Sequence, residues 1–163
     1  MRHSAMCNQK FLRSRARARG LTLVELLLVV SLVAVLASLA ASAWGGYQDR
    51  IRTKQAVDDI TGLSALLDQT FTDTGELPDS LADIGRGGMA DPWGNPYQYT
   101  NLTTAHGKGK ARKDHSLVPL NSDYDLYSKG SDGESVSPLT AKASKDDILR
   151  ANNGRFIGPA SSY

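Results

Sequence analysis

The apolar residues of the chain form one unbroken run followed by one periodic stripe. The run covers residues 21–44, and Glu25 is the only charged residue among these 24 positions. At about 1.5 Å per residue, a helix of this length spans roughly 36 Å, enough to cross a hydrocarbon core of about 30 Å. An ordinary secretory signal has a shorter apolar part, of about 7–15 residues. The run therefore predicts a helix that spans a membrane.

A second apolar pattern follows the run and keeps helical spacing. Five residues recur at intervals of four, three, four and four: Ala56, Ile60, Leu63, Leu67 and Phe71. This spacing places them on one face of a helix and leaves polar residues on the other faces. Gly75 follows shortly after, where a glycine commonly ends a helix. We predict one helix of about 50 residues, apolar all round in its first half and amphipathic in its second.

Shorter patterns in the rest of the chain predict turns and strands. Residues 91–97 (Asp-Pro-Trp-Gly-Asn-Pro-Tyr) carry the punctuation of a double turn that leads into a strand. Residues 124–128 alternate in polarity and predict a second strand. Phe156-Ile157 predicts a last short strand or packing anchor near the carboxyl end. We expect Trp93 to pack against the helical stripe.

Charge is concentrated at the amino end of the chain. Residues 1–20 contain six Arg or Lys residues and no acid, so they carry +6, and the rest carries −4 against a total of +2. This asymmetry indicates a targeting segment rather than a nucleic-acid surface, and basic residues beside a membrane helix stay cytoplasmic. Cys7, the only cysteine, lies in this segment. Once the segment is removed no disulfide can form, so a metal ion becomes the staple to look for.

A basic loop is expected over residues 104–116. Its cations are Lys108, Lys110, Arg112 and Lys113. No aromatic residue lies between them and the chain beyond residue 20 is acidic, which argues against nucleic-acid binding. We expect a solvent-exposed loop, with subunit or substrate contact as the alternative. His106 and His115, nine residues apart, give only a weak metal signal.

Glu25 is the unusual residue of the apolar run. A carboxylate in the middle of a membrane helix costs about 2.5–3.5 kcal/mol on insertion scales, and less near the interface. One explanation is local, because the first turn of a helix favours an acid and lies close to water. The other explanation is a positively charged partner within the membrane, which would offset much of the cost.

The residues around Glu25 resemble a known processing signal. Arg19-Gly20-Leu21-Thr22-Leu23-Val24-Glu25 is similar to the class III leader junction of type IV pilins and type II secretion pseudopilins. The resemblance implies that a membrane aspartyl peptidase cuts between Gly20 and Leu21 and that the new amine of Leu21 is methylated. It implies that Glu25 neutralises the amine of a neighbouring subunit. The chain departs from the family in having Leu21 instead of phenylalanine or methionine, and in having no proline before Pro78.

Two segments beyond the long helix also resemble the major pseudopilin of type II secretion. The first is the segment 91–97, which leads into a small antiparallel sheet in that family. The second covers 127–133 (Tyr-Ser-Lys-Gly-Ser-Asp-Gly) and 145–148 (Lys-Asp-Asp-Ile), which look like the family's calcium loop. This resemblance implies the following calcium ligands: the side chains of Asp132, Asp146 and Asp147 and the carbonyl of Lys129. The intervening segment is longer here than in the family, which leaves the other ligands open.

These resemblances imply an α+β, pilin-like fold. A long N-terminal helix, membrane-spanning in its first half, is expected to pack against a small antiparallel β-sheet that has a C-terminal loop region. We expect three segments: a basic prepilin leader at 1–20, a transmembrane and polymerisation helix at 21–45, and a periplasmic head at 46–163. The chain is expected in the bacterial inner membrane, single-pass, with its leader cytoplasmic and its head periplasmic.

The function expected from the resemblance is that of a structural subunit of a pseudopilus, assembled as a periplasmic filament. The expected partners are other copies of the chain through the N-terminal helix, minor pseudopilins, the prepilin peptidase and methyltransferase, and the inner-membrane assembly platform. A type IV pilus subunit is the alternative within this class, although the C-terminal disulfide loop common in those pilins is absent. A monomeric, membrane-anchored periplasmic binding protein is the alternative from another class. An enzyme is not expected, because no nucleophile–base pair, phosphate loop or His/Cys cluster is found.

Overall fold

The computed structural model describes residues 20–104, 110–116 and 118–163, without the side chains of residues 42 and 43. Its contacts divide the chain into one unit that ends at Ser42 and another that runs from Ala43 to Tyr163. The basic leader, apart from Gly20, lies outside the described residues. The predicted domain boundaries stay predictions.

The N-terminal element is the helix α1, Leu23–Thr74. It ends as predicted, because Gly75 adopts a φ of +80° and its N–H donates to the carbonyl of Phe71 at 2.8 Å. This is the left-handed glycine cap, which satisfies one of the carbonyls left free at a helix end. The 52 residues of α1 match the predicted length.

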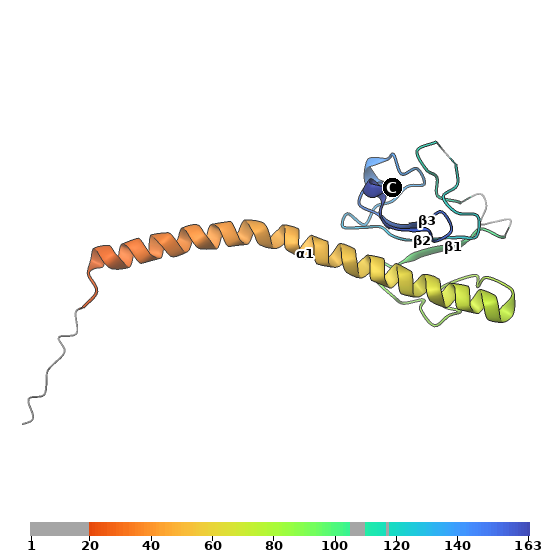
Figure 1. The fold of residues 1–163 in the computed structure, drawn as a ribbon, viewed down its shortest axis with the longest axis horizontal. Coiled ribbons are helices and arrows are strands. Elements are labelled where there is room, and N and C mark those ends of the chain that lie inside the picture. The colour runs from red at the N-terminus through yellow and green to blue at the C-terminus, as the bar shows by residue number, and fades with distance from the viewer. Residues whose placement is uncertain (1–19, 105–109, 117) are drawn as a thin grey trace, which may run out of the picture. The chain divides into compact units, whose positions relative to one another are not determined.

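The head contains a sheet of four antiparallel strands in the order β1-β2-β3-β4. The strands are β1 (Gln98–Asn101), β2 (Tyr124–Ser128), β3 (Ile148–Ala151) and β4 (Phe156–Pro159). Consecutive strands are neighbours, so the sheet is a simple meander, and its first three strands are labelled in Figure 1. Three of the four strands were expected from the sequence, and β3 was not.

The head-side part of α1 covers one face of this sheet (Figure 1). Alternate residues of a strand point to opposite faces, so Tyr124 and Leu126 of β2 and Ile148 of β3 join the helix in one core cluster. The helical residues of that cluster are Ala56, Ile60, Leu63 and Leu67. The helix-on-sheet arrangement confirms the predicted α+β, pilin-like fold.

The predicted stripe is correct for its first four residues and wrong for the fifth. Ala56, Ile60 and Leu67 are 0% exposed, whereas Phe71 is 50% exposed. Phe71 falls in the last turn of α1, beyond the residues that the core cluster includes. Trp93 packs against this cluster, as expected.

Loops cover the other face of the sheet. Leu149 and Ala151 of β3 join Leu120, Leu139 and Ala160 in a second buried cluster. Asp125 of β2 is also buried, at 2% exposure, and accepts hydrogen bonds from the Arg112 amide and the Asn121 side chain. The sheet is therefore buried on both faces, and its second face contains charged and amide side chains.

Candidate functional site

The first candidate site is the start of α1, where Thr22 caps the helix. The Oγ1 atom of Thr22 accepts the N–H of Glu25 at 3.2 Å, and its carbonyl accepts the N–H of Leu26 at 3.1 Å. Threonine is a preferred N-cap, and a glutamate three residues later is typical of a capping box. Glu25 therefore lies in the first turn, where the helix dipole favours a negative charge. The Thr-x-x-Glu signal for this cap was present in the sequence and was not used in the prediction.

The predicted cleavage bond lies just before this cap. Gly20 and Leu21 precede the first residue of α1, and the side chain of Leu21 is 70% exposed. The bond between them is therefore outside the hydrogen-bonded turns of the helix. Cleavage and methylation at this bond stay predictions.

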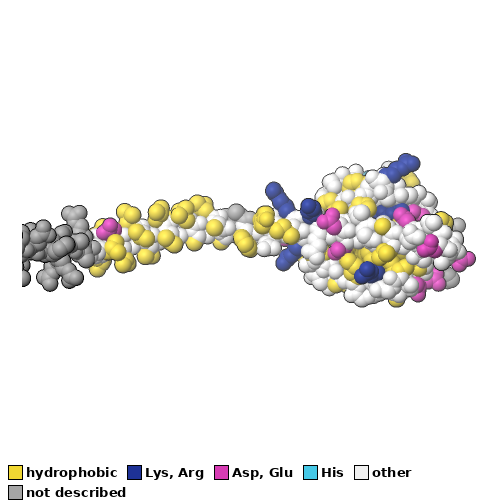
Figure 2. Space-filling model, turned by 60° about the horizontal axis from the view of Figure 1, so that its bottom comes forward, with side chains coloured by type: hydrophobic (Ala, Val, Ile, Leu, Met, Phe, Trp, Pro, Cys, Tyr) yellow, Lys and Arg dark blue, Asp and Glu magenta, His cyan; other side chains and the backbone are white. Residues whose placement is uncertain are grey.

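The first part of α1 exposes apolar side chains on all sides. Figure 2 shows hydrophobic side chains along the visible face of this segment. Its large apolar residues are between 49% and 78% exposed: Leu23, Val24, Leu26, Leu27, Leu28, Val29, Val30, Leu32, Val33, Val35, Leu36 and Leu39. The helix is long and apolar enough to cross a membrane. An all-apolar helix surface is stable only when lipid or other protein covers it.

The second candidate site is the loop between β2 and β3, where the calcium ligands were predicted. Asp146 Oδ2 accepts three hydrogen bonds from this loop: Ser131 N–H and hydroxyl, both at 2.8 Å, and Asp132 N–H at 3.1 Å. Asp132 is exposed, and its Oδ1 accepts the N–H of Glu134 at 2.8 Å. Asp146 thus connects the end of the loop to its beginning.

Asp147 is fully buried and forms an ion pair with Arg112. Its Oδ2 lies 2.6 Å from Arg112 Nη2 and 2.7 Å from the Ser135 hydroxyl. Arg112 is itself 3% exposed, which corrects the expectation that the basic residues of the 104–116 loop are solvated. Lys110, Lys113 and His115 are exposed as expected. Lys108 and His106 lie outside the described residues.

These positions test whether the predicted ligands fit a calcium ion. Calcium takes six to eight oxygen ligands at about 2.3–2.6 Å. Asp146 Oδ2 and Asp147 Oδ2 instead receive N–H and O–H donors of the chain. Asp147 Oδ1 is buried without a partner, but no three acidic, His or Cys side chains of the described residues are placed to hold a metal. The predicted set does not fit calcium in this arrangement, and calcium binding stays a prediction.

Burial is the largest influence on the pKa of two buried acids, Asp147 and Asp125. Burial raises the pKa of the Asp147 carboxyl, while the Ser135 hydroxyl and the Arg112 guanidinium act to lower it. Burial likewise raises the pKa of Asp125, against hydrogen bonds from the Arg112 amide and from Asn121. For both carboxyls, nearby donors offset part of the rise in pKa that burial causes.

The segment 91–97 forms hydrogen bonds with the end of β2 and with the loop between β2 and β3. Asp91 Oδ1 accepts the N–H groups of Trp93 at 3.0 Å and Asn95 at 2.8 Å, which fixes the turn. Its Oδ2 accepts the hydroxyl of Ser128, and the Asn95 amide donates to the carbonyl of Gly130 at 3.1 Å. The turn recognised in the sequence therefore positions the loop that follows β2.

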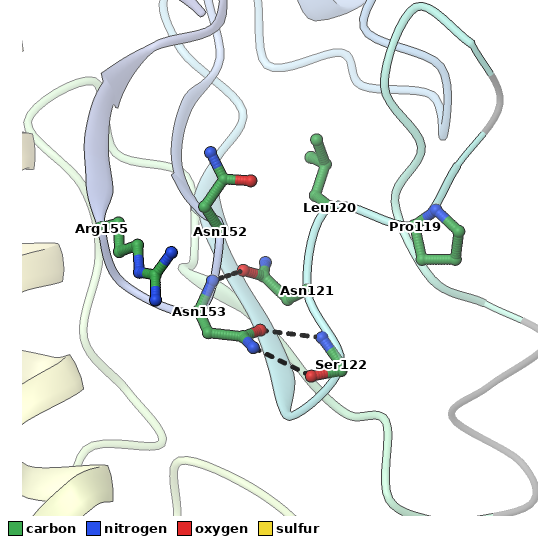
Figure 3. A pocket seen from close by; sticks show the side chains of 7 residues that line it. All are labelled: Pro119, Leu120, Asn121, Ser122, Asn152, Asn153 and Arg155. Atoms are coloured by element: carbon green, nitrogen blue, oxygen red, sulfur yellow. Dashed lines mark hydrogen bonds between the residues drawn. The ribbon is translucent and has the colours of Figure 1, made fainter.

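A hollow beside the β3–β4 turn is lined by residues that hydrogen-bond to one another (Figure 3). Asn153 N–H donates to Asn121 Oδ1, and the Asn153 side chain exchanges two bonds with Ser122, all at 2.9 Å. Asn152 and Asn153 adopt φ values of 53° and 54°, the left-handed region that asparagine tolerates. These contacts join the β3–β4 turn to the segment before β2, which is a structural role.

Comparison with known proteins agrees with the junction and with the head. Residues 15–41 match a family model described as the prokaryotic N-terminal methylation motif. The chain is 29% identical to type II secretion system core protein G of Escherichia coli K12 over 144 residues, covering 76% of this chain and 88% of that protein. It is 29% identical over 135 residues to the protein of the same name in Xanthomonas campestris, covering 74% and 83%.

A fimbrial protein is also similar. The chain is 27% identical over 157 residues to the type IV major fimbrial protein FimA of Dichelobacter nodosus, covering 88% of this chain and 87% of that protein. No solved structure matches.

Proposed function

We propose that this chain, a pilin-like protein that carries the N-terminal methylation motif and is related to type II secretion core protein G, is a structural subunit of a secretion pseudopilus. The observation that carries the proposal is the helix segment from Leu23 to Ser42. Its apolar side chains are exposed on all sides, and its one acid, Glu25, lies in the first turn. Such a surface is stable in lipid before assembly and within a bundle of identical helices after assembly.

Processing prepares the chain for this bundle. Cleavage of the Gly20–Leu21 bond removes six basic residues and creates an amine four residues before Glu25. Methylation of Leu21 keeps that amine positively charged. In the filament the amine lies beside Glu25 of a neighbouring copy, so that each charge offsets the other in an apolar surrounding. The pair also fixes the axial register between copies.

The membrane determines the direction of assembly. The basic leader remains in the cytoplasm, and the head faces the periplasm. The processed chain passes from the inner membrane into a periplasmic filament through the assembly platform, together with minor pseudopilins. The role is structural and involves no catalysis.

A type IV pilus subunit is the second candidate. Similarity to a type IV fimbrial protein over 88% of the chain favours it. Similarity to several core proteins G and the absence of cysteine beyond Cys7 favour the pseudopilus. Deletion separates the two: loss of protein export without loss of surface pili supports a pseudopilus.

A monomeric anchored binding protein would have no need of Glu25. Glu25→Ala and Glu25→Gln should therefore still insert in the membrane but form no ordered filaments, as judged by electron microscopy. Glu76→Gln removes an exposed acid of the head and should leave filaments normal. Mass spectrometry should find a methylated Leu21 at the mature N-terminus. Normal filaments from Glu25→Ala, or a retained leader, would contradict the proposal.

A further inference from the structure

Arg112 brings a positive charge into the loop between β2 and β3 from a distant part of the sequence. It precedes Asp147 by 35 residues, and its guanidinium is buried. Nη2 pairs with Asp147 Oδ2, Nη1 donates to the Ser135 hydroxyl, and the guanidinium carbon lies 4.1 Å from the ring centre of Tyr127. All three contacts are with residues of β2 or of the loop and its end.

The backbone of Arg112 is fixed as firmly as its side chain. Its N–H donates to Asp125 Oδ2 at 2.7 Å, and its carbonyl accepts the N–H of Leu120 at 2.9 Å. Asp125 belongs to β2, so the residue is tied directly to the sheet. The backbone of Arg112 is therefore fixed by contacts outside the loop between β2 and β3.

The loop also closes by contacts that need no ion. Asp146 Oδ2 receives the donors of Ser131 and Asp132 described above, and the hydroxyl of Ser144 accepts the N–H of Val136 at 3.0 Å. The backbones of Gly130 and Asp146 touch so closely that a Cβ on Gly130 would collide with the Asp146 carbonyl oxygen. The two ends of the loop are thus in direct contact.

A guanidinium and a divalent cation compete for the same carboxylate. Calcium beside Asp147 would lie a few ångströms from Arg112, and like charges at such distances repel strongly in a buried site. Removal of Arg112 would instead leave Asp147 buried and unpaired, which is strongly destabilising. Arg112, from outside the loop, already supplies a positive charge to the buried Asp147 carboxylate.

We propose that the Arg112 guanidinium takes the place of a bound metal ion in this chain, so that the loop between β2 and β3 closes without calcium. The proposal concerns the head alone and holds whether or not the chain polymerises.

The decisive experiment compares thermal unfolding of the full chain in detergent, with millimolar calcium and with excess EGTA. The expected result is the same Tm in both buffers, and no calcium retained after equilibrium dialysis against radioactive calcium. A Tm several degrees higher in calcium, or one calcium retained per chain, would overturn the proposal. Because the unaltered chain is used, no variant has to fold for this outcome to be read.

Variants then test the pair itself. Arg112→Gln should lower the Tm by about 10 °C or more in both buffers, whereas Arg155→Gln, which changes an exposed arginine, should leave it within about 1–2 °C. Combining Arg112→Gln with Asp147→Asn removes both charges and should recover part of the loss. A double variant as unstable as the sum of the two single variants would show that the charges are not coupled and would contradict the proposal.

Discussion

The hydroxyl of Tyr97, just before β1, donates a hydrogen bond to Asp59 Oδ2 at 2.8 Å and so joins the sheet to the second half of α1, 38 residues earlier. Tyr97 is 6% exposed. Burial, followed by the hydrogen bond to the Asp59 carboxylate, raises the pKa of the Tyr97 hydroxyl well above its ordinary value. Burial also raises the pKa of Tyr124, which is 1% exposed.

These tyrosines predict a loss of stability in alkali. A raised pKa in the folded state means that the unfolded chain releases the protons first, so stability is complete below about pH 10 and falls above it. Each buried tyrosine should contribute a slope of roughly 1.4 kcal/mol per pH unit. Denaturant unfolding at a series of pH values, with tyrosinate absorbance, measures this slope.

The matched variants are Tyr97→Phe and Tyr47→Phe. The first removes the buried hydroxyl and should reduce the alkaline slope. The second removes a hydroxyl on a side chain that is 60% exposed, and should leave the slope unchanged. Equal slopes in the unaltered chain and in Tyr97→Phe would show that Tyr97 does not contribute.

Gly130 should be irreplaceable by alanine. Its φ of +67° is unfavourable for other residues, and an added Cβ would collide with the Asp146 carbonyl. We expect Gly130→Ala to destabilise the head by about 3 kcal/mol or more. Gly62→Ala is the control, with the opposite effect on stability expected. Gly62 lies within α1, and a Cβ added there meets nothing within 4 Å, so the substitution should stabilise the protein by about 1 kcal/mol. Denaturant unfolding of both variants measures the difference, and similar stabilities would refute the close contact.

The end of the helical stripe gives a third prediction. Leu67 is fully buried and Phe71 is half exposed, although the two occupy equivalent positions in the pattern. Leu67→Ala should cost about 2–5 kcal/mol of unfolding free energy. Phe71→Ala should cost about 0.5 kcal/mol or less in the isolated protein. A large loss for Phe71→Ala would mean that the side chain is covered, contrary to the structure.

Local patterns in the sequence were sufficient for most of the fold. Helical spacing and the glycine after it located α1 and its end, because both depend on residues a few positions apart. The alternation at 124–128 likewise located β2 at its observed bounds. Phe71 was assigned wrongly because periodicity continues along a helix whether or not a sheet extends far enough to cover it.

Long-range pairing explains what the sequence did not predict. The strand β3 contains Arg150, whose burial depends on Asp123 at 2.7 Å and on the Tyr124 ring beneath its guanidinium. Arg112 was grouped with its lysine neighbours, because nothing local distinguishes a cation whose partner lies 35 residues further on. Each of these arginines is buried by acids and aromatic rings that become neighbours only after folding.

The cap formed by Thr22 has a consequence for the order of events at the membrane surface. Because helical winding starts at Leu23, the predicted cleavage bond between Gly20 and Leu21 lies outside the helix. A protease that requires a stretched substrate could act without first melting the anchor. After cleavage, the two non-helical residues Leu21 and Thr22 would leave the new N-terminus free to move toward a neighbouring molecule.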